Sequence, residues 1–98
     1  MRVKDGMQEA YRKRHCEVWP SVMESIRQQG VHNYSIYLDG QDLFAYLEVD
    51  DFDALLNSMA ADPENRRWQE SMAPIMEQPV ELDAKSPLRL MEEVFHVD

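Results

Sequence analysis

Apolar side chains recur at helical spacing in the first third of the chain. The series recurs at three- and four-residue steps, the period of one helix face, and consists of Met7, Ala10, Tyr11, Arg14, Val18 and Val22, in which Arg14 is the one charged member. Pro20 interrupts this run, because it lacks an amide hydrogen and pushes the residue before it out of the helical region. We therefore expect a break near residues 17–19, a second helical segment from Pro20 to Gln29, and an end at Gly30.

The middle of the chain alternates in the manner of a β-hairpin. Residues 31–39 read V-H-N-Y-S-I-Y-L-D and are rich in β-branched and aromatic side chains. In a regular strand, His32, Tyr34, Ile36 and Leu38 would share one face. Asp39-Gly40 is a turn signal, and residues 43–49 form the predicted return strand, antiparallel to the first.

Two further helices are predicted in the second half. Asp50 or Asp51 can cap the first, whose apolar positions fit one helix face at Phe52, Leu55, Leu56 and Met59. Asp62-Pro63-Glu64 begins the next helix with a cap, a proline at the first position and an early acid. The apolar stripe of this helix consists of Trp68, Met72, Ile75 and Met76.

The remaining segments complete a mixed fold. Residues 1–3 form a possible short strand, residues 77–87 read as a loop, and residues 90–97 are predicted to close the chain as a strand. The order strand, helix, strand, strand, helix, strand is typical of the ferredoxin-like α+β fold, here as one domain spanning residues 1–98. Helices on one face of such a sheet leave the other face partly apolar, which favours a homodimer in which two sheets face each other as a barrel.

Composition narrows the classes of partner. The 98 residues carry a formal net charge of −9, which repels phosphate backbones and anionic lipid, so we expect neither nucleic acid nor a membrane as a partner. The single cysteine, Cys16, can form neither an intrachain disulfide nor a cysteine-type zinc site. The first six residues lack the apolar region of a signal peptide, and no window approaches a transmembrane length. Cytoplasm is therefore the expected compartment.

His15 is the most informative candidate for chemistry. Tyr11 lies four residues before it, so the two rings project from the same face of the helix, which is otherwise its apolar face. This placement suggests the lining of a cavity in which an imidazole could do acid–base work on a neutral polar molecule. The alternative is an ordinary half-buried histidine beside its basic neighbours. The three histidines share no metal-ligand spacing, so no metal is expected.

The large aromatic residues have a structural and a functional interpretation. Trp19 and Trp68 can simply fill the core, but an indole that lines a pocket offers a flat apolar wall suited to a sugar ring. Tyr34 points the same way as its apolar neighbours and fits an ordinary core tyrosine with its hydroxyl at the rim.

Several segments together resemble the L-rhamnose mutarotase family. Residues 11–20, Y-R-K-R-H-C-E-V-W-P, are similar to its Y-x-x-R-H-x-x-x-W-P signature, and residues 30–38 are similar to its G-x-H-N-Y-x-I-Y-L strand. Residues 43–45, 67–68 and 93–95 fall where its matching segments do, so the resemblance covers essentially the whole chain in order.

The resemblance implies a dimeric α+β barrel whose members interconvert the α and β anomers of L-rhamnose without a cofactor. It places the catalytic histidine on His15, the substrate-binding tyrosines on Tyr11 and Tyr34, and the pocket tryptophan on Trp68. The substrate would be a monosaccharide, either L-rhamnose or a related 6-deoxy sugar.

Two features depart from the family pattern. Gln69 stands where members typically carry a second tryptophan, which is expected to affect the choice of sugar. The chain also begins several residues inside the usual first strand, so either the start codon is misassigned or the first strand is this short.

Other functions remain open on the same fold. Dimeric α+β barrels also include cofactor-free monooxygenases and haem-degrading proteins, and a cavity of this kind could bind a sugar without reacting. Accelerated anomer exchange would distinguish a mutarotase from each of these.

Overall fold

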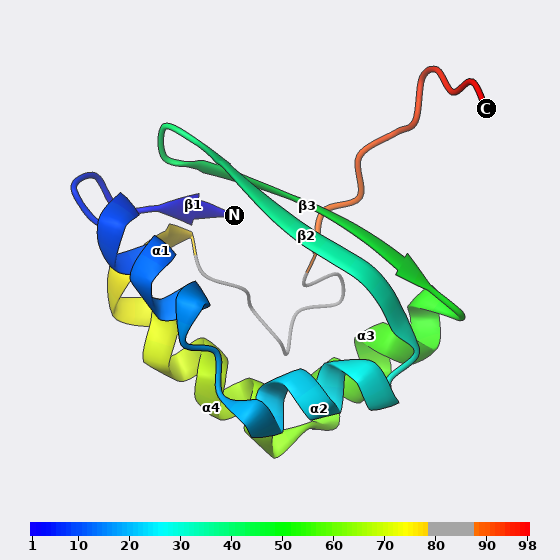
Figure 1. The fold of residues 1–98 in the computed structure, drawn as a ribbon, viewed down its shortest axis with the longest axis horizontal. Helices are drawn as coiled ribbons and strands as arrows, with labels where there is room; N and C mark the ends of the chain where they lie inside the picture. The colour runs from blue at the N-terminus through cyan, green and yellow to red at the C-terminus, as the bar shows by residue number, and fades with distance from the viewer. Residues whose placement is uncertain (79–87) are drawn as a thin grey trace.

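The computed structural model describes residues 1–78 and 88–98. Its regular elements follow the chain in the order β1 (Arg2–Val3), α1 (Gln8–Cys16), α2 (Pro20–Gln28), β2 (Val31–Asp39), β3 (Asp42–Val49), α3 (Phe52–Ala61), α4 (Pro63–Met72), a 3₁₀ turn (Ala73–Ile75) and β4 (Met76–Gln78). The four strands form one antiparallel sheet in the order β2-β3-β1-β4. Figure 1 shows the helices on one side of this sheet. The α+β class predicted from the sequence is confirmed.

Local signals position the helix ends as predicted. The chain breaks between α1 and α2, with Pro20 at the first position of α2. Asp51 caps α3 by accepting a hydrogen bond from the Ala54 amide at 3.1 Å, and Asp62 caps α4 by accepting one from the Glu64 amide at 3.0 Å. Gly30 follows α2 with a φ of 78°, a left-handed conformation that favours glycine.

A β-bulge interrupts the alternation of β2. His32 pairs with Glu48 and Ser35 pairs with Tyr46, so two residues of β2 lie opposite one residue of β3. Asn33, inside the bulge, has a φ of 47°. The prediction that His32 shares a face with Tyr34 is therefore wrong. The extra residue turns His32 to the exposed side of the sheet and leaves Tyr34 on the helix side.

The end of the chain also differs from the prediction. Residues 90–97 form no strand, and the fourth strand lies instead at Met76–Gln78, inside the segment expected to be a helix end and a loop. Pro74 explains the early helix end, because proline supplies no amide hydrogen and α4 gives way to a 3₁₀ turn. The predicted loop at 77–87 otherwise falls largely outside the described residues.

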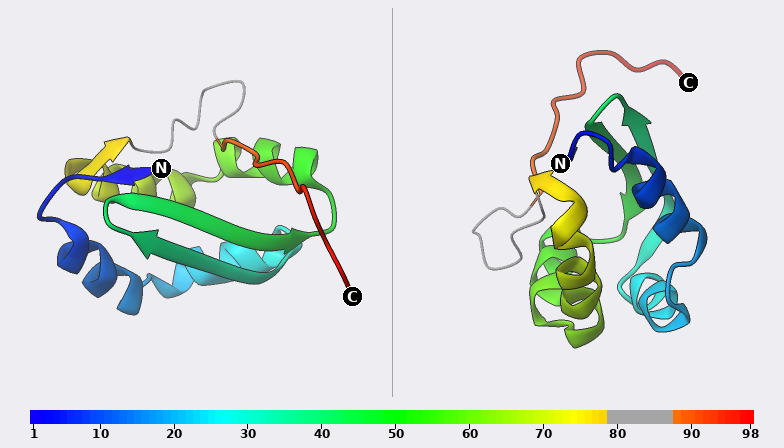
Figure 2. Two further views of the ribbon diagram at one scale, coloured as in Figure 1. Left: turned by 90° about the horizontal axis from the view of Figure 1, so that it is seen from above. Right: turned by 90° about the vertical axis from the view of Figure 1, so that its left-hand side faces the viewer.

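The core lies between the sheet and the helices. Its buried side chains come from every layer: Val3, Tyr11, Val22, Leu43, Trp68, Met72, Ile75 and Met76. The opposite face of the sheet carries the exposed aromatic residues Tyr37, Phe44 and Tyr46. Figure 2 shows the two helical pairs, α1–α2 and α3–α4, running side by side beneath the sheet. Within the described part of the chain, no helix is long and apolar enough to cross a membrane.

Candidate active site

The last turn of α1 holds His15 in a defined orientation. The His15 ring stacks on the Tyr11 ring with centroids 4.1 Å apart and planes 23° apart. Its Nδ1 lies 3.1 Å from the Tyr11 carbonyl oxygen. Since a carbonyl oxygen can only accept, Nδ1 carries the hydrogen, and in the neutral ring Nε2 keeps a lone pair. The four-residue spacing seen in the sequence thus fixes both the position and the tautomer of the imidazole.

Trp68 on α4 forms the second wall. Its indole meets the His15 ring edge-on, with centroids 5.6 Å apart. Trp19 also meets Trp68 edge-on, with centroids 5.2 Å apart. Arg14 donates a hydrogen bond to the Ser71 carbonyl and so ties α1 to α4 beside these rings. Trp68 is buried, and its edge-on contacts with His15 and Trp19 help to hold the indole in the pocket wall.

Tyr34 stands across the pocket on β2. Burial raises the pKa of the Tyr34 phenol. Burial also raises the pKa of Tyr11, and the nearby Tyr34 raises it further. Both phenols therefore remain protonated at neutral pH and can donate hydrogen bonds. Regular alternation along β2 places Tyr34 on the same side as Ile36, which also lines the pocket.

Burial lowers the pKa of His15, because removing the ring from water penalises its charged form. The hydrogen bond to the Tyr11 carbonyl acts in the opposite direction and is the smaller effect. The imidazole is therefore neutral at neutral pH, which is the form that can accept a proton at Nε2.

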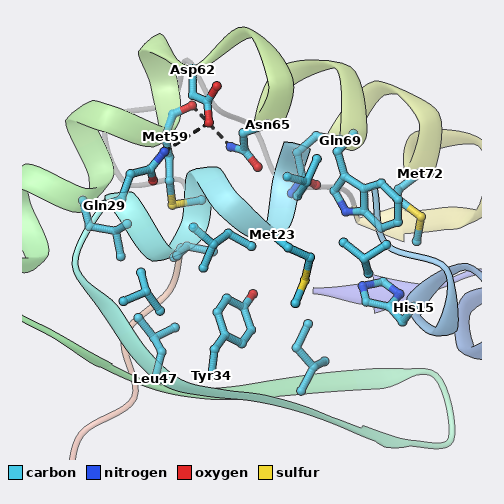
Figure 3. A pocket seen from close by; sticks show the side chains of 18 of the residues that line it. His15, Met23, Gln29, Tyr34, Leu47, Met59, Asp62, Asn65, Gln69 and Met72 are labelled. Carbon is cyan, nitrogen blue, oxygen red and sulfur yellow. Dashed lines mark hydrogen bonds between the residues drawn. The ribbon is translucent and has the colours of Figure 1, made fainter. Parts of the chain in front are cut away.

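These side chains line a single pocket of about 450 Å³ between the sheet and the four helices. Figure 3 shows His15, Tyr34 and Gln69 around its open space. All four residues singled out in the sequence, Tyr11, His15, Tyr34 and Trp68, lie in its wall. Trp19 does not line it and acts only through Trp68.

The far end of the pocket is polar, and the sequence analysis missed most of it. Asp62, Asn65 and Gln69 follow one another at three- and four-residue steps along the pocket side of α4, with Gln29 opposite. Gln29 donates a hydrogen bond to Asp62 at 3.1 Å, and Ser25 donates another. Within residues 1–78 and 88–98, the Gln69 amide has no hydrogen-bond partner and is open to a ligand. The signal in the sequence is the three- and four-residue spacing of Asp62, Asn65 and Gln69, of which only Gln69 is predicted above to affect the sugar and Asp62 to cap a helix.

The other candidate groups lie elsewhere. His32 pairs with Asp50 at 3.1 Å on the exposed side of the sheet, and His96 pairs with Asp98 at 2.9 Å near the chain end. Cys16 is exposed and unbridged. Among the described residues, no group of three or more potential ligands could hold a metal ion.

Known proteins of one family match this chain along nearly its full length. The family model for L-rhamnose mutarotase matches residues 1–97. An L-rhamnose mutarotase of Bacillus subtilis is 38% identical, with 100% of this chain and 93% of the relative covered. One from Listeria monocytogenes is 42% identical over 82% of this chain and 83% of the relative. The crystal structure of an L-rhamnose mutarotase from Formosa agariphila, 27% identical, superposes with a TM-score of 0.78 over 100% of this chain and 93% of that one. The chain belongs to the L-rhamnose mutarotase family.

Proposed function

We propose that this protein is an isomerase that interconverts the α and β anomers of L-rhamnose, or of a related 6-deoxy sugar, without a cofactor. The observation that carries this proposal is the neutral His15 ring, whose Nδ1 is held by the Tyr11 carbonyl while Nε2 is left to act in a pocket walled by Tyr34 and Trp68. A single base with a fixed tautomer, placed beside hydrogen-bond donors and an aromatic wall, suits proton transfer on a neutral polyol.

The reaction requires one proton to move between two oxygens of the sugar. His15 Nε2 takes the proton from the anomeric hydroxyl. As C1=O forms, the bond from C1 to the ring oxygen breaks, and the imidazolium returns the proton to that oxygen. The open chain turns about the C1–C2 bond, and the ring hydroxyl attacks the other face of the carbonyl. During ring closure, His15 takes the proton from the attacking hydroxyl and gives it to the former carbonyl oxygen. The histidine is then neutral again, and all atoms and charges balance.

The surrounding residues would orient the sugar. Both tyrosines hold their protons tightly, since burial raises each pKa, so their part is to donate hydrogen bonds rather than to ionise. Trp68 offers an apolar face against which the C–H side of the ring and its methyl group can lie. Because the tyrosines and Trp68 only position the sugar, His15 carries out both proton transfers.

The test is His15→Ala, followed by NMR saturation exchange between the α and β anomeric protons of L-rhamnose. General acid–base catalysis contributes about 10²–10⁴-fold, so enzyme-dependent exchange should fall by that factor. His32→Ala, which removes an exposed histidine outside the pocket, is the matched control and should retain wild-type exchange. Undiminished exchange in His15→Ala would remove that residue from the mechanism. Binding of L-rhamnose by the wild type without any exchange would identify a sugar-binding module instead.

We further propose a single-domain, ferredoxin-like subunit that forms a homodimer through the sheet, as a dimeric α+β barrel. The strand order β2-β3-β1-β4 supports the subunit fold, and the exposed Tyr37, Phe44 and Tyr46 support burial of the outer face. The enzyme would act in the cytoplasm, in rhamnose metabolism. A solution mass of twice the 11.5 kDa of the chain, measured by light scattering, would support the dimer.

A further inference from the structure

The polar end of the pocket holds two side-chain amides that the proposed proton transfers do not use. Gln29 follows the last residue of α2, Asn65 lies in the first turn of α4, and both line the pocket and are half-buried. Figure 3 shows them at the end of the open space away from His15. A sugar whose C1 meets His15 would therefore extend its opposite side toward these amides.

Asp62 fixes the orientation of the Gln29 amide. Gln29 Nε2 donates one hydrogen bond to Asp62 Oδ2 at 3.1 Å and another to Ser25 Oγ at 3.1 Å. Because a carboxylate oxygen can only accept, the amide nitrogen must face Asp62 and the amide oxygen must face away from it. No group in residues 1–78 and 88–98 donates to this oxygen. Gln29 thus offers the pocket an acceptor, while both of its amide hydrogens are in use.

The Asn65 amide is oriented in the same way by the backbone. Its Nδ2 donates a hydrogen bond to the Met59 carbonyl oxygen at 3.3 Å, and a peptide carbonyl can only accept. The amide oxygen therefore lies on the other side, and among the described residues it accepts no hydrogen bond. Figure 3 shows the oxygens of Gln29 and Asn65 on the side of the open space.

Asp62 supports these acceptors from behind. Its Oδ1 accepts a hydrogen bond from the Glu64 amide at 3.0 Å, and its Oδ2 accepts from Ser25 and Gln29. The bond from Gln29 to a charged carboxylate polarises the amide and strengthens its oxygen as an acceptor. This end of the pocket therefore presents two oriented acceptors beside a negative charge, and a matching ligand must bring hydrogen-bond donors.

We infer that Gln29 and Asn65 determine the specificity of the enzyme by accepting hydrogen bonds from the hydroxyls on C3 and C4 of the sugar. C4 lies across the pyranose ring from C1, C3 is next to it, and C5 of a 6-deoxy sugar carries a methyl group in place of a donor. This inference rests on the proposed function and adds which residues recognise the side of the sugar away from the reacting atoms. A sugar without one of these hydroxyls would leave an acceptor in the pocket unpaired, which lowers affinity.

The experiment combines two pocket variants with deoxy sugars. Calorimetry measures binding of L-rhamnose, 3-deoxy-L-rhamnose and 4-deoxy-L-rhamnose to the full chain as wild type, Gln29→Leu and Asn65→Leu. The wild type should bind each deoxy sugar about tenfold more weakly than L-rhamnose. Each variant should bind L-rhamnose about tenfold more weakly and should cease to discriminate against one of the deoxy sugars, because the hydroxyl and its acceptor are then absent together.

Asn65→Asp separates the role of the acceptor from that of the bond to the backbone. It loses the same hydrogen bond to the Met59 carbonyl as Asn65→Leu but keeps an oxygen, so it should retain the discrimination that Asn65→Leu loses. The matched controls are Gln28→Leu on α2 and Asn57→Leu on α3, which remove amides from exposed positions outside the pocket. Both should bind all three sugars with wild-type affinity.

Other results would overturn the inference. They are equal affinity of the wild type for the three sugars, undiminished binding of L-rhamnose by both leucine variants, and a loss in these variants that is the same for every sugar. Anomer exchange recorded on the same samples judges the proposed function separately. A wild type that binds and discriminates without exchange would contradict that function and leave this inference standing, whereas a wild type that binds none of the sugars would contradict both.

Discussion

At the scale of single residues, the environment of His15 sets the pH range of the proposed activity. Burial lowers its pKa from the ordinary value of about 6.5, so the neutral, proton-accepting form persists to more acidic pH than in a free imidazole. We expect anomer exchange to be constant through neutral pH and to fall only as the pH drops through this lowered pKa. The profile can be measured by saturation transfer, with the His15 Cε1 proton titrated in parallel.

The same shift links pH to stability. Below about pH 6.5 the unfolded chain binds a proton at residue 15 that the folded chain resists, so stability falls as the pH falls toward the folded-state pKa. Above that range the contribution is complete. His15→Ala should flatten this part of the stability profile. A His15 titration above pH 6.5 would contradict both expectations.

Gln69 is the residue at which sugar selection can be tested. Its amide lines the pocket directly after Trp68, and it has no hydrogen-bond partner within residues 1–78 and 88–98. An indole at this position would remove a group able to bind a hydroxyl and add an apolar wall. We expect Gln69→Trp to shift the ratio of exchange rates between L-rhamnose and L-mannose, its 6-hydroxy counterpart, toward L-rhamnose by about tenfold or more. The control is Gln28→Trp, at an exposed position on α2, which should leave the ratio of exchange rates unchanged. An unchanged ratio in Gln69→Trp would show that the Gln69 amide does not face C6 of the sugar.

At the scale of elements, Gly30 connects α2 to β2 under two constraints. Its φ of 78° is costly for any residue with a Cβ, and an added Cβ would lie 2.8 Å from Asp50 Oδ2. Gly40, in the turn between β2 and β3, has a φ of 60° but open space around its added Cβ. We expect Gly30→Ala and Gly40→Ala each to lower the free energy of unfolding by about 1–2 kcal/mol, with the larger loss at Gly30.

Denaturant unfolding measures the two losses and separates their causes. In an Asp50→Ala background the close contact is absent, so the excess cost of Gly30→Ala over Gly40→Ala should disappear. An excess that survives there would mean that the backbone conformation, and not Asp50, causes it.

Elements were predictable where their signals are local. Asp51, Asp62, Pro20 and Gly30 each act within four residues along the chain, and helix periodicity needs no knowledge of the partner. The β2 bulge was not predictable, because period-two alternation carries no mark of one inserted residue. The predicted fourth strand was wrong for a related reason: residues 90–97 have better strand composition than Met76–Gln78, but among the described residues it is Met76–Gln78 that pairs with β1.

The candidate site was also predictable only where local spacing determines it. The four-residue step from Tyr11 to His15 placed two side chains on one helix face, and the structure stacks their rings. Bringing Trp68 and Tyr34 to that pair depends on how α4 and β2 pack against α1, which no spacing reveals. Only the family resemblance grouped the four residues in advance, and it could not reach the polar end formed by Gln29, Asp62 and Asn65.

At the scale of the whole molecule, ligand binding should raise the free energy of unfolding. A ligand that binds only the folded state at one hundred times its dissociation constant stabilises it by about 2.7 kcal/mol. For a chain of this size, we expect L-rhamnose at that concentration to raise Tm by about 10 °C or more. The measurement is differential scanning calorimetry at one fixed protein concentration, since the proposed association of subunits would make Tm depend on concentration.

Tyr34→Phe is the control that ties this shift to the pocket. The substitution keeps the ring on β2 and removes only the hydroxyl, so Tm without sugar should stay close to that of the wild type, because Tyr34 makes no hydrogen bond within residues 1–78 and 88–98. With sugar, the loss of one hydrogen bond to the ligand should weaken binding by about tenfold, and the Tm shift at the same sugar concentration should shrink. An equal shift in the variant would place the sugar away from Tyr34, and the proton relay through His15 would then need a different pose.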